Sequence, residues 1–178
     1  IRVEVARAFF ETLRELGAFQ KDGHRSEEEL EGILSCKLSV AGRLTKYRFP
    51  KQRAKRIASA IKKLDDPIYE TRNPVLLRAA LQVIDGIGPK TASWICRNWL
   101  STEDVAIIDI HLIRACQIIG IFPAQITLPN DYDNLERRFL DFSRSIGIKA
   151  SVLDAVMWQQ MRTFTPSMIT TLTGNRVA

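Results

Sequence analysis

The sequence has no run of eighteen apolar residues, the length that a helix needs to cross a bilayer, so we expect no membrane-spanning segment. It also has few cysteines: Cys36, Cys96 and Cys116 lie far apart along the 178 residues. That spacing excludes the usual zinc patterns, a four-cysteine iron–sulfur site and an obvious disulfide framework. We therefore expect no bound metal and a reducing, cytoplasmic compartment.

Internal repeats and low-complexity segments are absent as well, and most apolar residues recur at helical spacing. The β-branched run VAIIDI at 105–110 is short and has no partner run, so we expect a loop that enters a helix there. The tail from Thr163 onward is weakly periodic and receives no assignment. The sequence thus predicts an all-α fold, with helices over 3–16, 27–36, 51–64, 74–84, 89–99, 110–119, 131–146 and 151–162.

Acidic residues are missing from one stretch. Residues 37–63 contain ten Lys or Arg and no Asp or Glu, whereas the rest of the chain has 16 basic and 20 acidic residues. A basic region on an acidic remainder favours a polyanionic partner. A solvated, lysine-rich helix face would have the same composition, so the charge pattern alone leaves both interpretations open.

A glycine turn, GIGPK at 86–90, separates two predicted helices. Gly86 and Gly88 allow positive φ and close approach of another backbone, and Pro89 suits the first turn of a helix. Backbone N–H groups at that helix start would form an anion site that fits a DNA phosphate, with Ile87 anchoring the turn in the core. The alternative is a helical hairpin with a plain glycine connector.

Lys90 and Asp109 are the candidate reactive pair. Lys90 lies just inside the second helix, where the dipole and nearby cations favour the neutral amine, a nucleophile that forms Schiff bases. Asp109 follows three apolar residues and precedes an apolar helix, which is the position of an N-cap. A structural cap would account for Asp109 alone, and a solvent-exposed residue would account for Lys90 alone. An ionised carboxylate near the amine would orient it or take its proton.

These motifs together resemble those of DNA glycosylases with a helix-hairpin-helix followed by a Gly/Pro…Asp region. In the lysine-bearing members the hairpin has the pattern L-P-G-V/I-G-x-K-x-A and the aspartate lies in D-x-H. The nineteen-residue spacing between lysine and aspartate also fits. The positions that match here are Gly86, Gly88, Lys90, Ala92, Asp109 and His111.

Within that superfamily the sequence is most similar to the archaeal-type 8-oxoguanine DNA glycosylases. The similarity covers roughly residues 27–160 and includes RFPKQRA at 48–54, IIDIH at 107–111 and GIKASVLDAVMW at 147–158. Two features depart from the pattern. Asp85 replaces the usual proline or lysine before the hairpin, and the chain continues for twenty residues past Trp158.

The resemblance implies a two-lobe helical architecture. Residues 27–100 would form a helical barrel lobe that contains the helix-hairpin-helix at about 74–99. Residues 1–26 together with 101–178 would form a second helical lobe with the catalytic aspartate. The partner would be double-stranded DNA containing a damaged base, bound by a nucleoid-associated monomer. No cofactor is implied, although a monovalent cation at the hairpin carbonyls, as in relatives, is compatible with the motif.

The resemblance also implies a chemistry. The enzyme would flip 8-oxoguanine out of the duplex, excise it with Lys90 and Asp109, and cleave the strand by β-elimination. Trp94, four residues after Lys90, and the i,i+4 pair Asp154 and Trp158 would form the base pocket. Without the resemblance, core packing would account for each tryptophan and a surface position for Asp154. The expected DNA-binding residues are Gly86, Ile87, Gly88, Arg48, Lys51 and Arg53.

Two other functions remain open from the sequence. A glycosylase of the same fold could act on another base, such as an oxidised pyrimidine, which the long tail and Asp85 favour. A helix-hairpin-helix module could instead bind DNA without catalysis, and it would form no covalent adduct with DNA.

Overall fold

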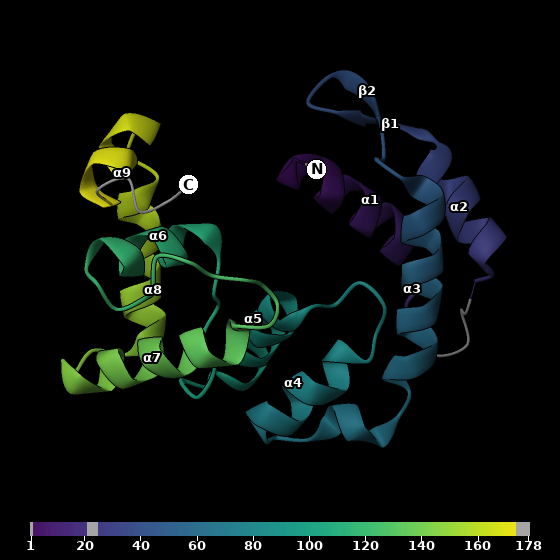
Figure 1. Ribbon diagram of the computed structural model, residues 1–178. Coiled ribbons are helices and arrows are strands. Elements are labelled where there is room, and N and C mark those ends of the chain that lie inside the picture. Colours follow the sequence, from purple (N-terminus) through teal and green to yellow (C-terminus); the bar gives the residue numbers. More distant parts are fainter. Residues whose placement is uncertain (1, 21–24, 174–178) are drawn as a thin grey trace. The chain divides into compact units, whose positions relative to one another are not determined.

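The computed structural model describes residues 2–20 and 25–173 (Figure 1). These residues are mostly helical, as the sequence predicts, and each expected helix is confirmed to within two residues. The helices are α1 (Val3–Glu15), α2 (Glu27–Ser35), α3 (Pro50–Leu64), α4 (Pro74–Gln82), α5 (Pro89–Leu100), α6 (Ile110–Ile118), α7 (Tyr132–Ser145) and α8 (Ala150–Met161), with a 3-10 turn, η1 (Pro67–Glu70).

Besides η1, a β-hairpin and a last helix were not expected from the sequence. Strands β1 (Lys37–Val40) and β2 (Arg43–Lys46) form a two-stranded antiparallel hairpin inside the basic stretch, with Ala41 and Gly42 at positive φ in its two-residue turn. The unassigned tail contains one further helix, α9 (Pro166–Thr173). The last tail residues, 174–178, lie outside the described part of the chain.

Contacts divide the chain into two compact units, and the first consists of residues 1–69 with 84–86. In this unit α2 packs against α3 (Figure 1). The apolar face of α1 is buried in the same core, which confirms the helical periodicity of residues 3–16. The core residues are Val5, Phe9, Leu13, Ala18, Leu30, Leu34, Val40 and Ala54.

The second unit consists of residues 70–83 with 87–178. Helix α5 packs against α4, and α8 packs against both α6 and α7. The core of this unit lies among α6, α7 and α8, and it is formed by residues that include Ile108, Leu112, Cys116, Leu135, Phe139 and Leu153.

These units do not coincide with the lobes implied by the resemblance, because α1 shares a core with α2 and α3 whereas α4 and α5 belong with the later helices. The division into lobes over 27–100 and over 1–26 with 101–178 stays a prediction. In the described residues no helix is both long and apolar enough to cross a membrane.

Local sequence signals set several helix starts. Ser26 and Glu29 form the expected capping box, in which the Ser26 hydroxyl accepts from the Glu29 N–H and the Glu29 carboxylate accepts from the Ser26 N–H. Asn73 caps α4 with its side-chain oxygen, and Pro74 is the first helical residue. Short polar residues at these positions satisfy N–H groups that a helix start leaves without partners.

Candidate active site

A cavity of about 670 Å³ lies in the second unit. Lys90 and Trp94 of α5, Asp109 at the start of α6, and Asp154 and Trp158 of α8 all line it. The structure therefore brings together every residue that the sequence suggested for catalysis and for the base pocket. A cavity of this size is in the range of ligand-binding sites.

Helix α5 starts at the glycine turn and presents Lys90. Gly88 is the N-cap, no side chain caps the helix, and Pro89 is the first helical residue. Ala92 and Ser93 face the core whereas Lys90 is exposed. The uncapped start leaves backbone N–H groups of the first turn available to an anion beside the lysine.

The two glycines of the turn play different parts. Gly86 has the expected positive φ of +86°, and a Cβ added there would lie 2.7 Å from Cδ of Arg56. Gly88 has φ −87° and ψ 177°, so it does not adopt the positive φ that a glycine allows. A Cβ at Gly88 would meet no atom within 4 Å. The fold itself accounts for the glycine at 86, whereas position 88 is open to an approaching molecule.

Asp85 has a partner in the structure. Its carboxylate lies 3.9 Å from Nε of Arg56 on α3, the same side chain that lies against Gly86. The acid before the hairpin therefore neutralises a neighbouring arginine. The expected anchor is also corrected: Ile84 is the fully buried residue of this turn, and Ile87 is only half-buried.

Asp109 is the N-cap of α6, as its position predicts. Its Oδ1 accepts the N–H groups of His111 and Leu112, each at 2.9 Å. Both hydrogen bonds use the same oxygen, so Oδ2 takes no part in the cap. The carboxylate is thus held at a helix start while one of its oxygens stays available to the cavity.

The extended run before Asp109 is held by side chains rather than by a neighbouring strand. The Ala106 N–H donates to the Glu136 carboxylate at 2.8 Å, and the Ile108 N–H donates to the Tyr132 hydroxyl at 3.2 Å. That hydroxyl donates in turn to the Ala106 carbonyl at 2.9 Å. The prediction of a loop here is confirmed, and α7 supplies the partners that a sheet would otherwise provide.

Glu136 is buried and also pairs with Arg78 of α4. Arg78 reaches Asp133 at 3.4 Å, and the Ser93 hydroxyl lies 3.5 Å from the Glu136 carboxylate. One carboxylate therefore links α4, α5, α7 and the run before Asp109. This network fixes the two segments that present Lys90 and Asp109 to the cavity.

Asp154 is buried, which excludes the interpretation as a surface acid. Its Oδ2 accepts a hydrogen bond from Nη1 of Arg97 on α5, so the structure gives it a cationic partner that the sequence did not suggest. Burial raises the pKa of Asp154; the Arg97 hydrogen bond and charge oppose this shift, Asp109 adds to it and Lys90 opposes it. Asp154 thus interacts electrostatically with both candidate catalytic residues.

Neither cavity tryptophan belongs to the core. Trp94 is 56% exposed and Trp158 is 40% exposed, which excludes the packing interpretation for both. The guanidinium of Arg162 lies 4.5 Å from the Trp158 ring centroid, and the His111 ring meets Trp158 edge-on at 6.0 Å. Trp94 therefore offers an exposed indole to the cavity, whereas Trp158 already has two neighbours.

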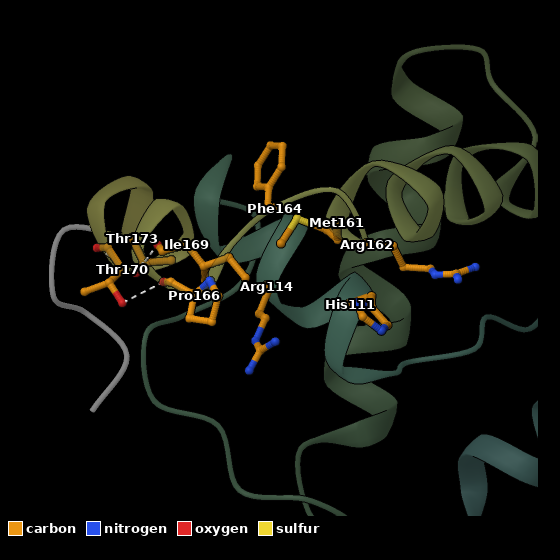
Figure 2. A pocket seen from close by; sticks show the side chains of 9 residues that line it. All are labelled: His111, Arg114, Met161, Arg162, Phe164, Pro166, Ile169, Thr170 and Thr173. Carbon is orange, nitrogen blue, oxygen red and sulfur yellow. Dashed lines mark hydrogen bonds between the residues drawn. The ribbon is translucent and has the colours of Figure 1, made fainter. Parts of the chain in front are cut away.

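A second cavity, of about 450 Å³, lies in the same unit (Figure 2). His111 and Arg114 of α6 and Arg162 lie on one part of its lining. Met161 of α8 and the tail supply the rest of the wall, the tail with Phe164, Pro166, Ile169, Thr170 and Thr173. Arg162 lines both cavities, so the tail, whose role the sequence left open, borders the neighbourhood of the candidate active site.

The expected DNA-binding side chains Arg48, Lys51 and Arg53 are exposed around the start of α3, in the first unit. Arg48 stacks on Phe49, with its guanidinium 4.8 Å from the ring centroid. Their role in DNA binding stays a prediction.

No group of three or more His, Cys, Asp or Glu side chains that could hold a metal ion occurs within residues 2–20 and 25–173. Cys96 and Cys116 are buried, and burial raises the pKa of the Cys116 thiol to about 12. A thiol of this kind stays protonated at neutral pH and acts as an apolar core residue.

Sequence reasoning missed several residues of this neighbourhood. Arg97 follows Lys90 by seven residues and Trp94 by three, so helical spacing places all three on one face of α5 and could have identified it. Tyr132, Glu136 and Arg162 gave no comparable signal, because their roles depend on contacts between distant segments.

The helical units, the glycine turn before a lysine-bearing helix, and the aspartate-capped helix define the class as helix-hairpin-helix proteins. The chain belongs to the 8-oxoguanine DNA glycosylase family, whose helix-hairpin-helix model matches residues 10–148. An 8-oxoguanine DNA glycosylase/AP lyase of Sulfurisphaera tokodaii is 30% identical over 133 residues, which cover 71% of this chain. The matched part spans 65% of that relative's length. No solved structure matches the chain.

Proposed function

We propose that this protein excises 8-oxoguanine from duplex DNA and then cleaves the strand at the abasic site, with Lys90 as nucleophile. The observation that supports this most directly is that Lys90 and Asp109 line one cavity with two partly exposed tryptophans. Family membership and the printed activity of the relative, 8-oxoguanine DNA glycosylase/AP lyase, agree with it.

The base must leave the stack before any side chain can reach its glycosidic bond. The N–H groups at the uncapped start of α5 and the basic residues Arg48, Lys51 and Arg53 hold phosphates, and the indole of Trp94 stacks on the extruded base. The protein acts as a monomer on chromosomal DNA in the cytoplasm.

The reaction then runs in two stages. The neutral amine of Lys90 forms a bond to C1′, the glycosidic bond breaks, and the base departs with the bonding electrons and takes up a proton. The Asp109 carboxylate stabilises positive charge that develops on the sugar and accepts a proton from the amine. The sugar ring opens to a Schiff base, loses a C2′ proton, and the C3′–O bond breaks by β-elimination.

Borohydride trapping tests this proposal, because the reagent reduces a Schiff base to a stable amine. Wild-type protein mixed with an 8-oxoguanine duplex should give a covalent protein–DNA adduct, and Lys90→Gln should give none. The matched control is Lys149→Gln, which removes an exposed lysine of the same unit. Absence of a wild-type adduct, or equal trapping by Lys90→Gln, would refute the mechanism and favour a non-catalytic DNA-binding module.

Asp109→Asn separates the cap from the chemistry in the same experiment. Asparagine caps helices about as well as aspartate, so the stability should change by less than about 0.5 kcal/mol, whereas excision should slow by about 10²-fold or more. Parallel duplexes with an oxidised pyrimidine or an undamaged base establish the substrate. Faster release of the oxidised pyrimidine would assign the protein to another damaged base.

A further inference from the structure

The ion pair between Arg97 and Asp154 lies in the wall of the candidate active-site cavity. Arg97 comes from α5, two helical turns after Lys90, and Asp154 comes from α8, one turn before Trp158. Their side chains are 17% and 9% exposed, and both line the cavity. The pair is therefore mostly removed from solvent but still borders the space that an extruded base would enter.

The pair has hydrogen-bonding capacity beyond its own contact. An arginine has five N–H donors in a planar fork, and a carboxylate has about four acceptor positions. The contact between them joins Nη1 and Oδ2. A molecule that fills the cavity would exclude water from the remaining donors and acceptors, and it must replace those hydrogen bonds to bind well.

We propose that Arg97 and Asp154 together select a base whose edge has an N–H donor beside a C=O acceptor. Asp154 accepts from the N–H, and the Arg97 fork donates to the carbonyl. This inference rests on the proposed function and identifies which cavity residues recognise the base. In 8-oxoguanine three arrangements have this pattern: N1–H with C6=O, N7–H with C8=O, and N7–H with C6=O on the Hoogsteen edge.

Arg97 also reduces the repulsion between the two carboxylates that line the cavity, Asp109 and Asp154. Asp109 lines the same cavity, and a second carboxylate without a cation beside it would repel the Asp109 carboxylate. The guanidinium of Arg97 beside Asp154 balances part of that negative charge locally. Arg97 thus offsets part of the electrostatic influence that Asp154 exerts on Asp109 and Lys90.

The test compares two reactions of the same protein. Excision from an 8-oxoguanine duplex needs the base pocket, whereas borohydride trapping on an abasic-site duplex needs Lys90 but no base. Arg97→Gln and Asp154→Asn should each slow excision at least about tenfold more than they slow abasic-site trapping. Arg97→Lys keeps the charge but loses the fork, so excision should recover only in part.

Abasic-site trapping by each variant also shows that the variant is folded. The control is Arg144→Gln, which breaks the exposed Arg144–Asp141 pair of α7, with a nitrogen–oxygen distance of 3.1 Å. Its excision and trapping rates should both stay within about twofold of wild type.

Two further bases identify the edge. Hypoxanthine has only the N1–H/C6=O edge, and 8-oxoadenine has only the N7–H/C8=O edge. If excision of one of them depends on Arg97 as 8-oxoguanine excision does, the pair binds the edge of that base. If neither base is excised, the pair binds the Hoogsteen edge, N7–H with C6=O, which both bases lack. The inference is overturned if Arg97→Gln and Asp154→Asn lower excision and abasic-site trapping equally, or lower neither. A wild type without any adduct on either duplex refutes the proposed function and this inference together.

Discussion

The second unit contains two arginine–carboxylate pairs with little exposure, and their surroundings differ. Glu136 pairs with Arg78 and also binds a backbone N–H, with Ser93 close by, so its oxygens serve the framework. Asp154 pairs with Arg97 on the wall of a cavity. The same pair of chemical groups thus stabilises structure where helices surround it and provides recognition where an open space borders it.

The largest expected effect is a difference in the free energy of unfolding between variants that break the Arg78–Glu136 pair and variants that break the Arg97–Asp154 pair. Glu136→Ala leaves the Ala106 N–H buried without a partner and leaves the largely buried Arg78 with only the exposed Asp133 carboxylate, at 3.4 Å, in place of a buried one. The free energy of unfolding should therefore fall by about 3–5 kcal/mol. Asp154→Ala leaves Arg97 next to a cavity where water can solvate it, so the loss should be only about 1–2 kcal/mol. Urea unfolding of both variants measures this, and equal losses would contradict the distinction.

A smaller loss of stability is expected at Tyr132, which, like Glu136, holds the backbone of the run before Asp109. Tyr132→Phe keeps the ring but leaves the Ile108 N–H and the Ala106 carbonyl without the hydroxyl, which should cost about 1–3 kcal/mol. The same variant should slow excision, because the run before Asp109 loses its support. Thermal unfolding and single-turnover excision check the two effects, and an unchanged melting temperature would show that the hydroxyl is dispensable.

The smallest expected effect is the pH dependence of stability. Two carboxylates at α8 should contribute to it in opposite directions: Glu103, which binds the start of the helix, and Asp154, which lies on it. Glu103 accepts from the Ser151 N–H at 2.8 Å at the start of α8. Burial would raise its pKa, but the Ser151 hydrogen bonds and the charges of Lys149 and Arg97 lower it overall, below the ordinary 4.5. Its stabilising contribution is present above pH 4.5 and is lost as the pH falls through the lowered value.

Asp154 should behave in the opposite way. Its pKa is raised above the ordinary 3.8, so its contribution to stability is greatest below pH 3.8 and declines as the pH rises through the raised value. Between pH 3 and pH 7, stability relative to wild type should therefore fall for Glu103→Gln and rise for Asp154→Asn. Melting curves of the three proteins over this range suffice, and parallel curves would refute the assignment of both shifts.

The sequence predicted the helices well because their signals are local. The Ser26 and Asn73 caps and the apolar periodicity each depend on residues within a few positions. The hairpin at 37–46 was missed because its strands are only four residues long and its Ala41–Gly42 turn lacks the common Asn-Gly pattern. Its pairing becomes evident only from the backbone.

The candidate site could be predicted in part. Motif spacing identified Lys90 and Asp109, and i,i+4 spacing identified Asp154 with Trp158. The partner of Asp154 lies 57 residues away, and the contacts of Glu136 extend over 30 to 58 residues, so no short-range pattern could indicate them. Charges that meet only after folding are the part of a site that sequence spacing cannot reveal.

The run from Val105 to Ile108 has a consequence for how such a protein can evolve. Its backbone is held by side chains of α7, at positions 132 and 136, rather than by a strand that would have to change with it. Residues within the run can therefore be exchanged for others of similar volume without loss of those hydrogen bonds. Selection for altered activity could thus reposition Asp109 through substitutions on α7, more than twenty residues away in sequence, while the reactive residues themselves stay the same.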